Sequence, residues 1–162
     1  MSFRILMIDD EVDLVESLKE ILQDDFAEVV TCDKPAQAYE ICLSSQFDLI
    51  ISDHNLAEVN GLELLKILRS EGIMTPFILM TGFASKDIAI DSVRLGISDL
   101  LEKPVDLHEL KLSIARVMEL EKSRSFYYKT LALDNPEHVQ ARRQFSQRLG
   151  QLLASIQIKK TA

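Results

Sequence analysis

The chain has 162 residues, of which 47% are hydrophobic and 27% charged, as expected of a soluble protein with a buried core. Its apolar stretches are far shorter than the roughly 20 residues of a membrane span, and its N-terminus does not fit a secretory signal, so we expect a cytoplasmic protein. The formal net charge is −8, and Cys32 and Cys42 lack metal-site spacing, so we expect them to be buried free thiols.

Five short apolar runs predict β-strands within the first 120 residues. They are rich in β-branched residues and do not alternate strictly between apolar and polar positions, which is typical of strands buried on both faces. The predicted strands are Phe3–Ile8, Glu28–Thr31, Asp48–Ser52, Phe77–Met80 and Ser98–Leu101.

Amphipathic segments between and after these runs predict five helices. Pro35 suits the first turn of the second helix, and Gly72 suits the cap that ends the third. The apolar residues at helical spacing are Val12, Val15, Leu18, Ile21 and Leu22; Ala38, Ile41 and Cys42; Leu62, Leu64, Leu65, Ile67 and Leu68; Ile88, Val93 and Leu95; and Leu107, Leu110, Ile114, Val117 and Met118. Five strand–helix units in sequence predict an α/β fold with a doubly wound parallel sheet of five strands in the order 2-1-3-4-5.

Four of the predicted strands are followed by residues suited to phosphoryl-transfer chemistry. Asp9 and Asp10 follow the first strand, Asp53 the third, Thr81 the fourth and Lys103 the fifth. Each alone has a simpler interpretation, such as a helix cap, a loop aspartate, a tight turn or a solvated lysine. Because the carboxyl ends of parallel strands share one edge, we expect all of them to converge on a single site. Crowded carboxylate oxygens there would suit a magnesium ion.

Together these motifs resemble the receiver domain of two-component response regulators over about residues 3–122. The similarity runs through Asp9-Asp10-Glu11, Asp53 with Leu56 and Gly61, Thr81-Gly82, and Asp99-Leu100-Leu101-Glu102-Lys103-Pro104. The resemblance implies a flavodoxin-like fold and a signalling switch rather than an enzyme, with only self-phosphorylation and autodephosphorylation.

The resemblance also implies a role for each site residue. Asp53 would accept a phosphoryl group from a histidine kinase or phosphotransfer protein, Thr81 would contact the phosphoryl oxygen, and Lys103 would pair with it. Asp9, Asp10, Asp53 and the main-chain carbonyl of Asn55 would hold Mg²⁺. These implied ligands and partners define the expected site.

Three positions depart from the family's usual pattern. Leu100 stands where a Tyr or Phe usually moves with the Thr hydroxyl, so the Thr81–Leu100 switch would lack a phenol hydrogen bond. Ala57 replaces the usual Pro after Asp53, which should loosen that loop. Phe83 is interpreted either as a loop aromatic capping the fourth helix or as a shield that slows loss of the phosphoryl group.

Two other functions compete with the signalling switch. A haloacid-dehalogenase-like phosphatase also uses an aspartate nucleophile, but in an Asp-x-Asp pattern after the first strand, which this chain lacks. A DNA-binding transcription regulator is suggested by charge: residues 1–122 carry a net −13 and residues 123–162 a net +5. No helix-turn-helix pattern is visible in the basic segment, which argues against sequence-specific DNA binding.

The composition shift divides the chain into an expected receiver domain, residues 1–122, and a helical extension, residues 123–162. The fifth helix is expected to continue past Lys122, and Asp134-Asn135-Pro136-Glu137 predicts a break and a restart. Beyond it, Phe145, Leu149, Leu152 and Ile156 form an a/d-type stripe about two heptads long. So short a stripe must pack on something, which predicts either a homodimer or a tail folded back on the receiver.

Overall fold

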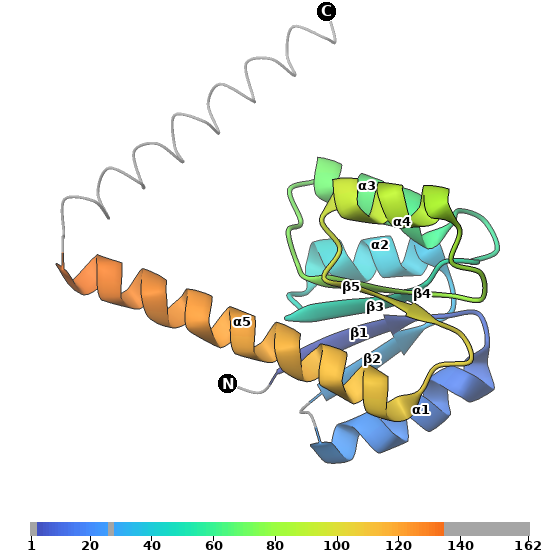
Figure 1. Ribbon diagram of the computed structural model, residues 1–162, viewed down its shortest axis with the longest axis horizontal. Coiled ribbons are helices and arrows are strands. Elements are labelled where there is room, and N and C mark those ends of the chain that lie inside the picture. Colours follow the sequence, from blue (N-terminus) through green and yellow to red (C-terminus); the bar gives the residue numbers. More distant parts are fainter. Residues whose placement is uncertain (1–2, 26–27, 135–162) are drawn as a thin grey trace, which may run out of the picture. The chain divides into compact units, whose positions relative to one another are not determined.

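A computed structural model describes residues 3–25 and 28–134 of the chain (Figure 1). Within these ranges, five strands alternate with five helices, and each predicted strand is confirmed to within one residue at each end. The elements are β1 Arg4–Ile8, α1 Val12–Asp25, β2 Glu28–Cys32, α2 Pro35–Ser44, β3 Leu49–Asp53, α3 Gly61–Ser70, β4 Phe77–Thr81, α4 Lys86–Leu95, β5 Asp99–Glu102 and α5 Leu107–Asp134.

The five strands form one parallel sheet in the order β2-β1-β3-β4-β5, as predicted. Figure 1 shows α1 and the start of α5 on one face of the sheet and α2, α3 and α4 on the other. The alternation of side chains along β1 supplies both cores: Ile5 and Met7 face the α1/α5 side, whereas Leu6 and Ile8 face the α2/α3 side. The fold is therefore the predicted flavodoxin-like α/β architecture.

Helix boundaries follow the local signals that predicted them. Pro35 occupies the first turn of α2, and Gly72 follows α3 with a φ of 80°, a left-handed conformation that costs glycine little. The spacing of apolar residues overestimates burial at Val12, Ile21 and Val93, which are exposed. Val12 stands in the first turn of α1, and burial on α1 is concentrated at the positions farther along the helix.

Both cysteines are buried free thiols, and burial raises the pKa of each to about 11. Neither thiol therefore ionises near neutral pH, which agrees with their interpretation as small hydrophobic residues. Among the described helices, none is both long and apolar enough to cross a membrane.

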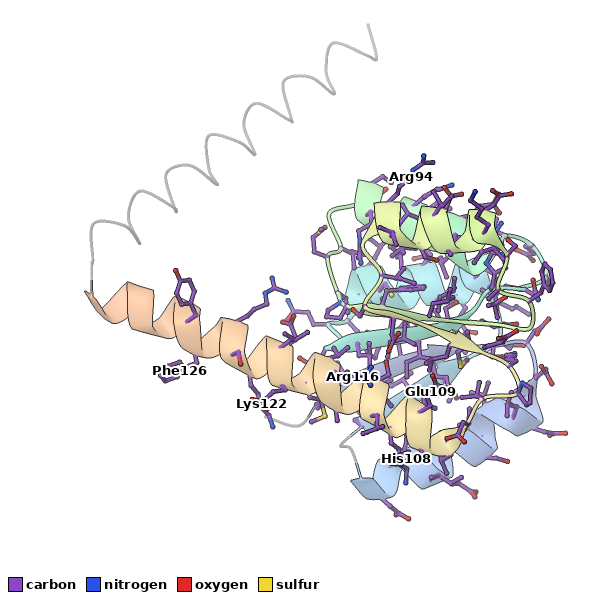
Figure 2. All side chains as sticks on the ribbon, viewed as in Figure 1. Arg94, His108, Glu109, Arg116, Lys122 and Phe126 are labelled. Carbon is purple, nitrogen blue, oxygen red and sulfur yellow. The ribbon has the colours of Figure 1, made fainter. Side chains whose placement is uncertain are left out.

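The chain divides into two compact units, one that ends at Glu119 and one that begins at Leu120, within α5. In the second unit, α5 continues past Lys122 as predicted, and Leu120, Phe126 and Tyr127 are each more than 60% exposed. Figure 2 labels Lys122 and Phe126 on this part of α5. The predicted break after Asp134 and the apolar stripe over residues 145–156 lie outside the described residues.

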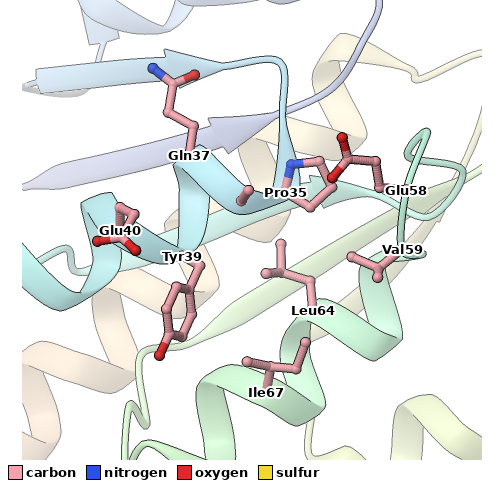
Figure 3. Close-up of a pocket in the computed structure, with 9 residues that line it drawn as sticks. Pro35, Gln37, Tyr39, Glu40, Glu58, Val59, Leu64 and Ile67 are labelled. Atoms are coloured by element: carbon pink, nitrogen blue, oxygen red, sulfur yellow. The ribbon is translucent and has the colours of Figure 1, made fainter.

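A hollow of about 540 Å³ lies between α2 and α3 (Figure 3). Apolar side chains such as Pro35, Leu64 and Ile67 line it together with the carboxylates of Glu40 and Glu58. It shares no residue with the strand-end site described next.

Candidate functional site

The strand register brings the four predicted strand ends together. Ile8 at the end of β1 pairs with Ser52, so Asp9 follows level with Asp53. Asp53 pairs with Met80 in β4, and Thr81 at the end of β4 pairs with Glu102, which precedes Lys103. The predicted convergence of these residues at one edge of the sheet is thus confirmed.

Three carboxylates form the floor and rim of the site. Asp9, Asp10 and Asp53 each offer an oxygen atom, and these atoms lie within 4.8 Å of one another. Asp9 and Asp53 are buried, whereas Asp10 is exposed at the rim. Burial raises the pKa of Asp9, although its hydrogen bond to Lys103 opposes the shift, so the charged carboxylate is destabilised there.

This donor set fits a hard divalent cation. Carboxylate oxygens are the ligands that Mg²⁺ prefers, and one or two of them suffice because the ion keeps several waters. Asp53 Oδ1 is buried and has no hydrogen-bond partner among the described residues, which leaves an acceptor for a cation or an N–H donor. A cation would also relieve the repulsion among the three carboxylates.

Lys103 supplies positive charge to this cluster. Its Nζ lies 2.8 Å from Asp9 Oδ2, 3.2 Å from Glu11 Oε1 and 3.3 Å from Asp53 Oδ1. Burial lowers the pKa of Lys103, but the hydrogen bond to Asp9 and the charges of Asp9 and Asp53 outweigh it, so the pKa is raised. The ammonium therefore remains charged at neutral pH beside the Asp53 carboxylate. The Lys103–Pro104 peptide bond that follows is cis.

Thr81 is buried at the same edge, and its hydroxyl is engaged with its own loop. Oγ1 accepts a hydrogen bond from the Phe83 N–H and donates one to the Phe83 carbonyl, both at 3.2 Å. The hydroxyl can reach a new acceptor only by giving up its bond to that carbonyl. Such an exchange would couple the site to the loop that leads into α4.

Leu100 packs on the α2/α3 side of the sheet, where it is partly buried. The next residue, Leu101, is buried on the opposite side, against the α1/α5 core. Leu100 therefore lies on the side of the sheet that α4 covers, and its apolar side chain can repack there without a hydrogen bond.

The loop after Asp53 is anchored by a close approach at Gly61. A Cβ atom at Gly61 would collide with the Asp53 carbonyl oxygen and with Leu79. The Gly61 N–H also donates to the His54 carbonyl at 2.9 Å. Asn55 and Ala57 are exposed in the loop between these anchors.

Two features of the site were missed by the sequence analysis. Glu11 was noted only as part of an acidic run, yet its carboxylate is an ion-pair partner of Lys103. Gly61 was noted only as part of the family pattern, whereas its close contact with Asp53 depends on tertiary packing. Acidic residues beside a strand end are a sequence signal for the contact between Glu11 and Lys103. Nothing in the local sequence indicates the contact between Gly61 and Asp53.

Known proteins of one family resemble this chain in sequence and structure. Residues 5–115 match the family model of the response regulator receiver domain. The transcriptional regulatory protein CiaR of Streptococcus pneumoniae is 37% identical over 132 residues, which is 82% of this chain and 58% of CiaR. The alginate biosynthesis transcriptional regulatory protein AlgB of Pseudomonas syringae is 32% identical over 117 residues, 72% of this chain and 26% of AlgB.

Solved structures similar to this chain also include response regulators and their receiver domains. The chemotaxis response regulator CheY4 of Vibrio cholerae is 28% identical and superposes with a TM-score of 0.66, covering 72% of this chain and 99% of CheY4. A CheY-like receiver domain protein of Methanospirillum hungatei is 27% identical with a TM-score of 0.71, covering 76% of this chain and 99% of that one.

The chain thus spans little more than half of CiaR and about a quarter of AlgB. Its match to the family model extends from β1 into α5 and contains every residue of the strand-end site. With the sheet order and the superposed structures, this match shows that the chain belongs to the family of response regulator receiver domains.

Proposed function

We propose that the chain is a phosphorylation-activated switch of a two-component system, in which Asp53 accepts a phosphoryl group from a histidine kinase or a phosphotransfer protein. The observation that carries this proposal is the buried Asp53 carboxylate with Lys103 Nζ at 3.3 Å and two further carboxylates beside it. That arrangement suits a nucleophile whose product carries additional negative charge.

In the proposed transfer, one bond to phosphorus forms and one bond to phosphorus breaks. A carboxylate oxygen of Asp53 forms a bond to phosphorus as the bond between phosphorus and the donor's histidine nitrogen breaks, and the electron pair of that bond stays on the nitrogen. Lys103 pairs with the phosphoryl oxygens, and the Thr81 hydroxyl exchanges its bond to the Phe83 carbonyl for one of them. Positioning and fixed charge do most of the work in such a transfer.

We infer that Asp9, Asp10, Asp53 and the main-chain carbonyl of Asn55 would hold Mg²⁺ at this site. The three carboxylates supply the hard oxygen ligands that the ion prefers. When bound, Mg²⁺ would neutralise part of the charge on the transferring phosphoryl oxygens.

The proposed output is a population shift toward the state in which Thr81 has moved inward. Thr81 leads into the loop before α4, and Leu100 in the neighbouring strand β5 pairs with Leu79, so the affected surface would comprise α4, β5 and α5 over residues 86–121. Amide exchange with and without beryllofluoride, an analogue of the phosphoryl group, should change across this surface. Changes confined to the loop after Asp53 would count against this output.

Phosphorylation at Asp53 is tested with acetyl phosphate and magnesium, which should add one phosphoryl group to the parent protein. Asp53→Asn should abolish the addition, whereas Asp10→Asn should only slow it because Asp10 lies at the exposed rim. Asp48→Asn, which changes an aspartate at the opposite end of β3, serves as the control. Undiminished incorporation in Asp53→Asn would refute the assignment.

A turnover assay with a phosphomonoester separates a switch from a phosphatase. A switch releases its own phosphoryl group but does not turn over a phosphomonoester, and this is the behaviour we expect. Repeated turnover of p-nitrophenyl phosphate that is lost in Asp53→Asn would favour the phosphatase instead.

A second proposal concerns the molecules with which the switch interacts, namely DNA or a second copy of the chain. CiaR and AlgB are named transcriptional regulators, and the basic segment after residue 122 is suited to contacts with nucleic-acid phosphates. We nevertheless favour self-association over specific DNA binding, because the a/d-type stripe needs a partner surface. Discrimination between DNA sequences, rather than salt-sensitive binding to any duplex, would be required to reverse this choice.

Homodimer formation through residues 123–162 is tested by size-exclusion chromatography with light scattering. The exposed Leu120, Phe126 and Tyr127 on α5 would add apolar area to the stripe. The full chain should be a dimer, and a version that ends at Lys122 should be a monomer. A monomeric full chain, with and without beryllofluoride, would leave the folded-back tail as the better account.

A further inference from the structure

The three carboxylates around Lys103 hold its ammonium group in different ways. Asp9 accepts a hydrogen bond at 2.8 Å and its side chain is fully buried. Glu11 accepts one at 3.2 Å, and 64% of its side chain is exposed. Asp53 Oδ1 lies 3.3 Å from Nζ and is left without a hydrogen bond. The ammonium is thus bonded to Asp9 and Glu11 and only adjacent to Asp53.

Bonding to a phosphoryl group on Asp53 requires the ammonium to turn toward new acceptors. An ammonium has three N–H donors, and two of them are already directed at Asp9 and Glu11. Only one donor is left for the phosphoryl oxygens, so a second hydrogen bond to them requires the release of Asp9 or Glu11. Releasing Asp9 would leave a buried carboxylate unpaired, which is costly. Releasing Glu11 costs little because its exposed carboxylate can be hydrated instead. Glu11 is therefore the partner that can be exchanged.

We propose that Glu11 is a positioning residue that holds Lys103 in its unphosphorylated arrangement and is displaced when the phosphoryl group forms. This inference rests on the proposed phosphorylation of Asp53 and adds an interaction, the contact between Glu11 and Lys103, that opposes the phosphorylation. The Glu11 N–H also donates to Asp9 Oδ1 at 2.9 Å, so the main chain at Glu11 is anchored to the residue that keeps Lys103 in place. Loss of the Glu11 side chain should therefore free one ammonium donor without displacing Lys103.

The charge of Glu11 has two further effects that the test must separate from its contact with Lys103. It would attract a cation and would repel an anionic phosphoryl analogue. Three variants resolve these effects. Glu11→Gln removes the charge and keeps the length, and Glu11→Asp keeps the charge and shortens the reach to Lys103. Asp13→Asn removes an exposed carboxylate from the first turn of α1, two residues after Glu11.

The first measurement is the affinity for beryllofluoride at saturating magnesium. Glu11→Gln and Glu11→Asp should both bind about 1.5- to 5-fold more tightly than the parent, the range expected when an exposed ion pair is removed. Asp13→Asn should bind like the parent. Affinity that is unchanged or weaker in Glu11→Asp, or an equal gain in Asp13→Asn, would overturn the proposal because general charge would then explain the effect.

The second measurement is the ¹⁵N signal of the Lys103 ammonium, which needs no phosphoryl analogue and is assigned by its loss in Lys103→Met. In the free protein this signal should shift in both Glu11 variants and stay unchanged in Asp13→Asn. Equal signals in the parent and the Glu11 variants would refute the Lys103–Glu11 contact. A parent that binds no beryllofluoride would instead refute the proposed function, while the ammonium signal still reports on that contact.

Discussion

Phe83 stands two residues after Thr81, and its main chain is fixed by two hydrogen bonds to the Thr81 hydroxyl. Its side chain is 73% exposed. An exposed ring held at the edge that carries Asp53 can hinder the approach of water to a phosphoryl group. We therefore predict that Phe83→Ala shortens the half-life of phosphorylated Asp53, measured by loss of the phosphoryl label.

Phe126→Ala is the matched control, because Phe126 is an equally exposed phenylalanine on α5. It should leave the half-life unchanged. If Phe83→Ala also has no effect, Phe83 is only a loop aromatic before α4, the other interpretation that its position in the sequence allowed.

Ser92 carries a buried hydroxyl on α4 for which the described residues provide no hydrogen-bond partner. A buried polar group without a partner costs about 1–3 kcal/mol, so Ser92→Ala should raise the free energy of unfolding by roughly 1 kcal/mol. Urea denaturation monitored by circular dichroism measures this change.

Ser113 on α5 provides the opposite case for the same substitution. Its hydroxyl is equally buried but donates to Asp99 Oδ2 at 2.7 Å. Ser113→Ala should therefore lower the free energy of unfolding by about 1.5–3 kcal/mol, as expected for the loss of a hydrogen bond to a charged group. Equal effects of the two substitutions would contradict this account.

The site residues could be predicted because each is the last residue of a strand or the first one after it, where the chain must leave the sheet. The positions of Asp9, Asp53, Thr81 and Lys103 then follow from strand order alone. The Lys103–Glu11 contact could not be predicted, since it depends on the reach of two flexible side chains. The burial of the Ser92 hydroxyl could not be predicted either, because α4 has a weak apolar pattern and the neighbouring Val93 is exposed.

The start of α3 illustrates how an element holds the site in place. Asn60 and Glu63 form a capping box, in which Asn60 Oδ1 accepts from the Glu63 N–H at 2.9 Å and Glu63 Oε2 accepts from the Asn60 N–H at 3.0 Å. Gly61, the first residue of α3, is the residue that packs against the Asp53 carbonyl. The cap therefore fixes the end of the loop that begins at Asp53.

We predict that Asn60→Ala lowers the free energy of unfolding by about 1 kcal/mol, the usual cost of losing an N-terminal cap. Asn60→Asp should retain most of the stability because Asp caps helices about as well as Asn. Thermal and urea denaturation of the three proteins measure the difference. The same loss in Asn60→Asp and Asn60→Ala would show that the cap is not the cause.

At the level of elements, prediction was most accurate where a breaker residue marks a boundary, as at Pro35 and Gly72. It was least accurate for burial at helix ends, because spacing alone does not show how far the sheet extends beneath the helix. Val12 has the spacing of a core residue but stands in the first turn of α1, and it is exposed.

The burial of the Asp9 carboxylate affects the stability of the whole molecule. Because burial raises the pKa of Asp9, the native state loses stability as the pH rises from the unfolded pKa through the higher native pKa, so at neutral pH the charged site is a net cost. A bound cation should offset this cost. We predict that Mg²⁺ raises the melting temperature, by an amount equivalent to about 2.7 kcal/mol at 100 times its dissociation constant.

Asp10→Asn should reduce this magnesium effect, since it removes one of the three clustered carboxylates. Asp24→Asn, an exposed position farther along α1, should keep it. Calorimetry with and without Mg²⁺ measures both. A magnesium effect that is the same in Asp10→Asn as in the parent would show that the ion acts elsewhere.

Both core clusters of the described residues end no later than the first part of α5. Among the residues whose burial is described, the last buried apolar one is Val117, and Met118 is the last one packed against either core cluster. A version that ends at Lys122 therefore retains every residue of these two clusters. We predict that it unfolds in one cooperative transition, with a melting temperature close to that of the full chain at low protein concentration.

Phosphorylation provides the second readout for this version. All residues of the proposed site precede residue 104, so the version that ends at Lys122 should accept a phosphoryl group from acetyl phosphate at the rate of the full chain. If residues 123–162 form only a dimer contact, the two proteins should differ in mass and in the concentration dependence of melting, but not in this rate. A large change in the rate would show that the extension acts on the site itself and that the division at residue 122 is misplaced as a functional boundary.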